Sequence, residues 1–193
     1  MKDLNVLIVG VGGQGTLLAS RFLGAVAELA GADVKVSEVH GMSQRGGSVE
    51  TCVKLGTDIK SPIIDRGEAD VILSFEQLEA ARFISYLRPQ GTIIVNEQKI
   101  NPMTVVSGNA TYPENVMKAL NIPGVTLISA DALSVAEKCG TAKAVNMVLL
   151  GILCSKMKDI DDSIFLKALE KVVPPKFLEI NKKAFAEGFK MGK

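Results

Sequence analysis

Two short segments of this 193-residue chain hold most of the groups that could bind a ligand. The first, Gly10–Gly15, reads GVGGQG and fits the G-x-G-x-x-G pattern. Glycines allow a sharp turn and let a ligand approach backbone N–H groups, and a helix that starts just after such a turn attracts anions. The segment therefore predicts a phosphate or carboxylate site, although a tight turn without a ligand fits the same letters. Its candidate binding residues are Gly10, Gly12, Gly13, Gln14 and Gly15.

The second segment, His40–Gly47, reads HGMSQRGG and contains the only histidine of the chain. The guanidinium of Arg45 is a planar fork suited to carboxylate or phosphate. No cysteine or carboxylate partner is identifiable for His40, so we expect a local hydrogen-bonding role and assign no catalytic residue. A solvated loop remains the alternative for the whole segment. Its candidate binding residues are Ser43, Gln44, Arg45, Gly46 and Gly47.

The elements that carry these segments depart from a simple βαβ repeat. Asn5–Val9 is a continuous apolar run typical of a buried parallel strand, and Thr16–Ala30 has helical length and good helix formers. Asp33–Val39 and Ser48–Leu55 both have strand character, but only eight residues lie between them. Because a parallel crossover needs about a dozen residues or more, these two strands either pair antiparallel or lie apart.

The rest of the chain predicts further strands and a helical C-terminus. We expect strands at Asp70–Phe75, Thr92–Asn96 and Val125–Ser129, helices at Glu76–Leu87, Pro113–Leu120, Ala142–Lys156, Asp162–Val172 and Pro175–Lys190, and a helix N-cap at Asp131. These predict one Rossmann-like α/β domain over residues 1–193, with three layers and a mostly parallel sheet that is non-classical after its second strand. Ligands of such sheets collect beyond the carboxyl ends of the strands, so the two polar segments should be neighbours.

Composition excludes several classes of function. The charges nearly balance, with 22 basic and 21 acidic residues, and aromatic residues make up only 5%; both facts argue against binding to nucleic acid or membranes. The N-terminus has no signal-peptide pattern and no apolar run is long enough to cross a bilayer, so we expect a cytoplasmic protein. Cys52, Cys139 and Cys154 lack metal-ligand spacing and are expected to be buried hydrophobes. No metal site is predicted.

A stand-alone oxidoreductase that binds NAD or FAD is one alternative. Such an enzyme needs an acid at the end of its second strand to bind the ribose, and Glu38 has that position. A structural assembly module whose loops have no ligand is another alternative.

Four segments in the same order resemble the gamma-type domain of the 2-oxoacid:ferredoxin oxidoreductases. They are GVGGQG, EVHGMSQRGGSV, EADVILSFEQLEAAR and NMVLLG, which begin at Gly10, Glu38, Glu68 and Asn146. The resemblance covers residues 4 to 185, and GMSQRGGSV is most similar to the beta subunits of the indolepyruvate branch.

The resemblance implies an enzyme complex that oxidatively decarboxylates an aryl 2-oxoacid, with coenzyme A as acyl acceptor and ferredoxin as electron acceptor. Thiamine diphosphate, Mg²⁺ and iron–sulfur clusters would serve that chemistry. This chain lacks a GDG motif with a downstream asparagine and lacks a ferredoxin-type cysteine run. We therefore expect it to be inactive alone and to hold no cofactor, while a larger partner subunit carries thiamine diphosphate and the clusters. The two polar segments would then contribute to an anion site, with the phosphates of coenzyme A as the expected ligand.

Overall fold

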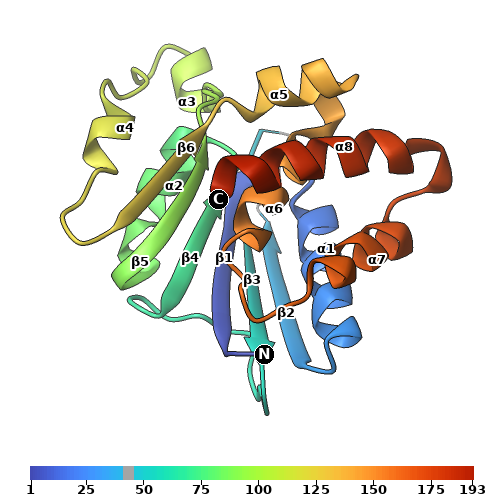
Figure 1. Ribbon diagram of the computed structural model, residues 1–193. Coiled ribbons are helices and arrows are strands. Elements are labelled where there is room, and N and C mark those ends of the chain that lie inside the picture. Colours follow the sequence, from blue (N-terminus) through green and yellow to red (C-terminus); the bar gives the residue numbers. More distant parts are fainter. Residues whose placement is uncertain (41–45) are drawn as a thin grey trace.

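The computed structural model describes residues 1–40 and 46–193, with His40 described by its backbone alone (Figure 1). The strands are β1 Leu4–Val11, β2 Asp33–His40, β3 Ser48–Gly56, β4 Ala69–Ser74, β5 Leu87–Asn96 and β6 Thr126–Ala130. The helices are α1 Thr16–Leu29, α2 Gln77–Arg82, α3 Met103–Val106, α4 Val116–Ala119, α5 Ala132–Cys139, α6 Val145–Cys154, α7 Asp162–Val172 and α8 Pro175–Gly192, and single 3₁₀ turns span Ile84–Tyr86 and Ala142–Ala144.

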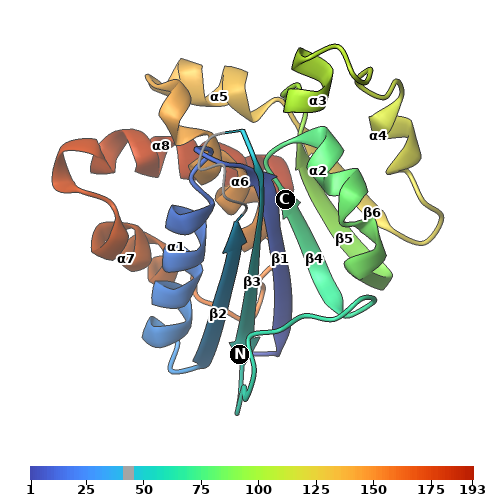
Figure 2. The same ribbon diagram turned by 180° about the vertical axis from the view of Figure 1, so that it is seen from behind.

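The six strands form one sheet in the order β2-β3-β1-β4-β5-β6. β1, β4, β5 and β6 pair in parallel, whereas β3 pairs antiparallel with both β1 and β2. β2 therefore runs in the same direction as β1, and β3 is the one strand of this sheet that runs the other way. Figure 2 shows β3 lying between β2 and β1. The prediction of a mostly parallel sheet that departs from the usual order after its second strand is confirmed.

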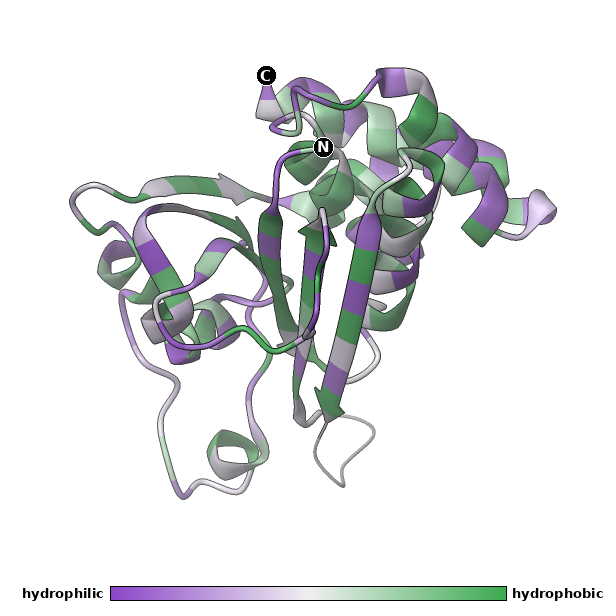
Figure 3. Ribbon diagram, turned by 90° about the horizontal axis from the view of Figure 1, so that it is seen from below, coloured by the Kyte–Doolittle hydropathy of each residue, from purple (hydrophilic) through white to green (hydrophobic). Residues whose placement is uncertain are grey.

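Helices cover the sheet on both faces and complete three layers. The larger apolar core lies between β1, β3 and β4 and the helices α1, α5, α6, α7 and α8. On the opposite face, Ala80 of α2 and Val116 of α4 pack against β5, and Ile64 covers Cys52. In Figure 3 the central strands are mostly hydrophobic, whereas the outer helices are banded hydrophobic and hydrophilic, as expected for strands buried on both faces.

The apolar segment near residue 150 is the most deeply buried helix. Every residue of α6 from Asn146 to Cys154 is buried, so the expectation of a core helix is confirmed. α8 packs directly on its backbone: a Cβ added at Gly188 would lie 1.9 Å from the carbonyl oxygen of Val148, and one at Gly151 would lie 2.2 Å from that of Phe185. Glycine at these positions lets the two helices touch without intervening side chains.

Two predicted elements differ from the structure. The helix predicted at Glu76–Leu87 is shorter: α2 ends at Arg82, and Leu87 instead begins β5 and pairs with Ala69 of β4. Pairing with a neighbouring strand therefore overrides local helix propensity. The single helix predicted at Pro113–Leu120 is reduced to α4, and the short helix α3, which was not predicted, precedes it. Within the described ranges, no helix is both long and apolar enough to cross a membrane.

Candidate functional site

The two polar segments meet at the carboxyl edge of the sheet. Val11 at the end of β1 pairs with Ser48 at the start of β3, and the N–H of Gly12 donates a hydrogen bond to the carbonyl oxygen of Gly47 at 2.9 Å. The prediction that these segments are neighbours is confirmed for Gly47, at the described end of the second segment, while residues 41–45 lie outside the described residues. The antiparallel insertion of β3 causes this contact, because it returns the chain to β1 directly after the second segment.

The side chain of Gln14 closes the glycine loop from within. Its Oε1 accepts a hydrogen bond from the N–H of Val11 at 2.7 Å, and its Nε2 donates to the carbonyl oxygen of Phe75 at 3.0 Å. A Cβ on Gly10 would lie 2.9 Å from that Oε1 and 3.1 Å from the Cβ of Phe75, so the turn has no room for a side chain there. Gly10 and Gln14 thus fix the conformation of the glycine loop.

Beside the loop lies a pocket of about 460 Å³. The residues that line it come from the glycine loop before α1, the segment after β5, α5, the 3₁₀ turn after α5 and the start of α6: Gly13, Gln14, Gly15, Gln98, Leu133, Ala142, Lys143, Val145 and Asn146. Gly13 has a φ of 101° and nothing within 4 Å of where a Cβ would stand. The N–H groups of Gly13 and Gly15 have no hydrogen-bond partner among the described residues. Free donors at the N-terminus of α1 make this pocket favourable for an anion.

Two side chains add to the pocket, Lys143 from the 3₁₀ turn Ala142–Ala144 and Asn146 from the start of α6. Lys143 is exposed and is the one charged residue among the described residues that line it. Asn146 is only 4% exposed, and its amide nitrogen lies 2.8 Å from where a Cβ on Gly15 would stand. That nitrogen donates no hydrogen bond to any residue in the described part of the chain. A cation, and an amide donor without a partner among the described residues, therefore line the same pocket as the glycine loop before α1.

Beneath the loop, the buried Asn96 and the half-buried Gln14 and Gln98 connect neighbouring strand ends through their side-chain amides. The Nε2 of Gln14 lies 3.3 Å from the Oε1 of Gln98, and the Nδ2 of Asn96 lies 3.3 Å from the same oxygen. The Oδ1 of Asn96 accepts from the N–H of Ala132 at the start of α5. Since each of these groups is satisfied, the network fixes the relative positions of the pocket walls.

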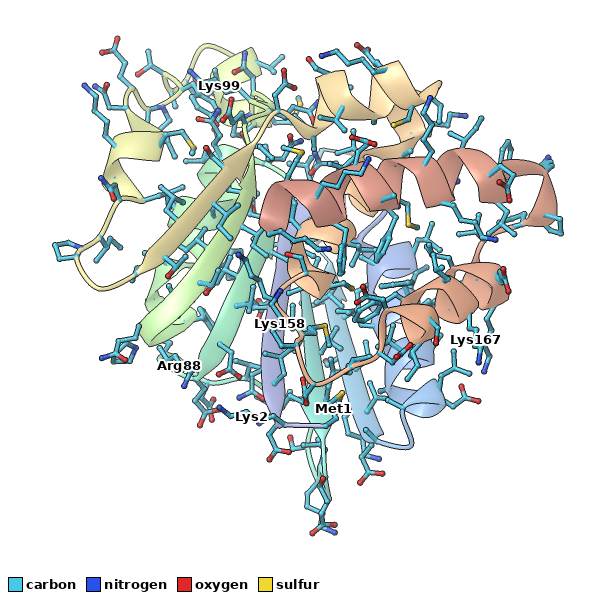
Figure 4. The ribbon with its side chains drawn as sticks, viewed as in Figure 1. Met1, Lys2, Arg88, Lys99, Lys158 and Lys167 are labelled. Carbon is cyan, nitrogen blue, oxygen red and sulfur yellow. The ribbon has the colours of Figure 1, made fainter. Side chains whose placement is uncertain are left out.

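Two buried carboxylates, at the start of α2, lie near the glycine loop but do not line the pocket. Glu76 is 1% exposed and Glu79 is 4% exposed. Burial raises the pKa of the Glu79 carboxyl, although a hydrogen bond from Ser48 and the charge of Arg82 oppose that shift. Burial and the hydrogen bond to Glu76 raise the pKa of the Tyr112 hydroxyl. Lys99, labelled in Figure 4 at the end of the molecule opposite Arg88, has its ammonium 5.8 Å from the centre of the Tyr112 ring.

Sequence reasoning found only part of this site. Ser43, Gln44 and Arg45 lie outside the described residues and stay predictions, while Gly46 and Gly47 lead into β3. Lys143, Asn146 and Gln98 were not predicted. Asn146 was the first letter of NMVLLG, and a buried amide at the start of an apolar helix was the available signal.

The dinucleotide alternative is not supported. In that alternative Glu38 must reach a ribose bound at Gly10–Gly15. Because β3 lies between β1 and β2 and strands are spaced about 4.8 Å apart, Glu38 is two strands, or about 10 Å, away from β1. Its nearest described partner is the hydroxyl of Thr51 on β3, at 3.5 Å.

Comparisons with known proteins agree on one family. The family model described as pyruvate ferredoxin/flavodoxin oxidoreductase matches residues 5–191. The chain is 40% identical over 197 aligned positions to indolepyruvate oxidoreductase subunit IorB of Thermococcus kodakarensis, covering 100% of this chain and 98% of that protein.

Solved structures share the fold. The gamma subunit of a keto/oxoacid ferredoxin oxidoreductase from Geobacter sulfurreducens superposes with a TM-score of 0.72 at 22% identity, covering 98% of both chains. A 2-oxoglutarate:ferredoxin oxidoreductase from Magnetococcus marinus, solved with 2-oxoglutarate, coenzyme A and succinyl-CoA bound, also gives 0.72 at 19% identity. It matches 100% of this chain but only 31% of its own length.

Proposed function

The chain belongs to the pyruvate ferredoxin/flavodoxin oxidoreductase family, and from this premise we propose that it is the smaller subunit of an indolepyruvate-type oxidoreductase. The complex oxidatively decarboxylates an aryl 2-oxoacid, transfers the acyl group to coenzyme A and passes electrons to ferredoxin. The observation that carries this proposal is the 40% identity to an IorB subunit over the whole chain.

The residues present do not fit the redox cofactors of such a complex. Iron–sulfur clusters need several converging thiolates, but Cys52, Cys139 and Cys154 are buried in β3, α5 and α6. No group of three or more His, Cys, Asp or Glu residues in the described ranges is placed to hold a metal ion. We therefore assign thiamine diphosphate, Mg²⁺ and the clusters to a larger partner subunit, in a cytoplasmic complex in which residues 1–193 act as one domain.

The part of this chain that faces the reaction is the pocket at the N-terminus of α1. The backbone donors that have no partner among the described residues, together with the Lys143 ammonium and the Asn146 amide, suit the phosphates of coenzyme A, with the carboxylate of the 2-oxoacid as second candidate. Arg45 supplies a further charged donor in this proposal. The pocket is open enough for a partner subunit to complete it, which agrees with a chain that is inactive alone.

Steady-state kinetics of the reconstituted complex test the anion site. Lys143→Ala and Arg45→Ala should each raise the KM for coenzyme A, because losing one charge-assisted hydrogen bond costs about 1.5–3 kcal/mol, roughly 10- to 150-fold in affinity. Arg45→Lys should rescue little, since an ammonium cannot reproduce the fork, and Gln44→Ala should have a smaller effect. Lys138→Ala is the matched control, because Lys138 is exposed on α5 and does not line the pocket.

Two results would overturn this assignment. If Lys143→Ala and Arg45→Ala leave the KM for coenzyme A unchanged, the pocket does not bind it. If Arg45→Ala prevents the subunits from associating, the second polar segment is an interface and the structural-module alternative is favoured. Purification from the native host, with thiamine and iron analysis, tests the larger partner separately.

A further inference from the structure

The buried carboxylates Glu76 and Glu79 have no place in an anion site, because they would repel the ligand. Burying two carboxylates at the start of one short helix is nevertheless unfavourable unless each is well hydrogen-bonded. Their partners therefore indicate what the pair does.

Glu76 fixes the start of α2 and the segment after β5. Its Oε2 accepts the N–H of Glu79 at 3.0 Å as the N-cap of α2. Its Oε1 accepts the N–H of Ile100 at 3.1 Å and the hydroxyl of Tyr112 at 2.5 Å. These three donors hold α2 rigidly at the carboxyl edge of the sheet, and α2 in turn presents Glu79.

Glu79 fixes the point where the chain enters β3. Its Oε2 accepts the hydroxyl of Ser48 at 2.5 Å, and its Oε1 lies 3.5 Å from the Nε of Arg82. Ser48 directly follows Gly47, whose carbonyl oxygen accepts the N–H of Gly12. The Glu79 carboxylate therefore holds Ser48, the neighbour of Gly47. Gly47 in turn makes the one backbone hydrogen bond in the described structure that joins the glycine loop to the second polar segment.

We propose that Glu79 is a positioning residue for the pocket, acting through Ser48 and the Gly47–Gly12 hydrogen bond to hold the glycine loop at the geometry that its ligand needs. This inference rests on the proposed function only for its effect on the KM for coenzyme A; the effect on the Gly47–Gly12 hydrogen bond is independent of it. Four groups face Glu79 from the elements packed around it, namely Ser48, Arg82, Glu76 and Tyr112. Protonation of Glu79 would weaken its hold on Ser48 and Arg82, and burial brings that protonation closer to neutral pH by raising the pKa of Glu79.

Kinetics of the reconstituted complex provide the first test, with Glu79→Gln, Ser48→Ala and the double variant. Each single change should raise the KM for coenzyme A about 2- to 12-fold, the range expected for one hydrogen bond, and should change kcat less than about twofold. The double variant should match the worse single variant, because both act through one contact. In the wild type the KM should rise as the pH falls toward the pKa of Glu79, and Glu79→Gln should lose that dependence. Glu97→Gln is the control, since Glu97 is exposed at the end of β5.

Amide hydrogen exchange of the full chain, followed by NMR, provides a test that does not involve coenzyme A. Exchange at Gly12 should be faster in Glu79→Gln and Ser48→Ala than in the wild type, and unchanged in Glu97→Gln. Additive effects in the double variant, or unchanged Gly12 exchange in both single variants, would overturn the positioning role. If Lys143→Ala leaves the KM unchanged but Gly12 exchange still responds, the proposed ligand is wrong and the positioning role stands.

Discussion

Gly188→Ala should destabilise the chain although it replaces glycine by the best helix former. A Cβ at this position would lie 1.9 Å from the carbonyl oxygen of Val148, whereas real contacts of this kind stay beyond 3.0 Å. The helices α6 and α8 must therefore separate by about 1 Å along their shared seam, and such overpacking costs about 1–3 kcal/mol or more. Taking about 3 kcal/mol, the melting temperature should fall by about 6–12 °C for a chain of this size.

Gly24→Ala is the matched control. Gly24 lies inside α1, and a methyl group added there would have no atom within 4 Å, so only helix propensity acts, and the variant should gain about 1 kcal/mol. Thermal unfolding by circular dichroism and urea denaturation compare the two variants with the wild type. If Gly188→Ala is as stable as Gly24→Ala, the backbones of α6 and α8 are not in direct contact at Gly188.

Three further predictions concern the core, the pH dependence of stability and the cofactors. Leu149→Asp should unfold the chain, because Leu149 is fully buried and an unpaired buried charge costs several kcal/mol; Leu166→Asp, at a position 46% exposed, should fold, and circular dichroism distinguishes them. Burial raises the pKa of Glu79 above its usual 4.5, so the folded chain binds this proton more tightly than the unfolded chain. The contribution of Glu79 to stability is then greatest below pH 4.5 and declines as the pH rises through the folded pKa, and Glu79→Gln should remove that decline from urea-unfolding curves. The purified single chain should be colourless, and visible absorption from a stoichiometric iron–sulfur centre would contradict the assignment of clusters to a partner.

Local signals were sufficient for the elements whose boundaries are fixed by neighbouring residues. α7 spans the predicted residues, and Asp161 fixes its start by accepting the N–H of Ser163. α1 ends beside Gly31, which has a φ of 68° that glycine adopts readily. The predicted N-cap Asp131 accepts the N–H of Ser134.

Long-range contacts account for what sequence reasoning missed. The strand predicted from Thr92 in fact begins at Leu87, before Pro89 and Gly91, because Leu87 pairs with Ala69 of β4. Likewise, Lys143 and Asn146 lie far from Gly10–Gly15 in the sequence but line the same pocket in the fold. The sequence pattern around Gly10–Gly15 does not indicate which distant segment will pack beside it.

The inserted strand β3 also constrains the order in which the sheet can assemble. In an ordinary βαβ unit the first two strands pair with each other, so the unit can form early and by itself. Here, among the described strands, β2 pairs only with β3, and β3 pairs with β1. The pairing of β1 with β3 must therefore close a long loop that contains α1 and β2, and closing such loops slows folding. β2 and β3 are consecutive antiparallel strands and can pair early as a hairpin, so the two polar segments meet only when β3 then pairs with β1.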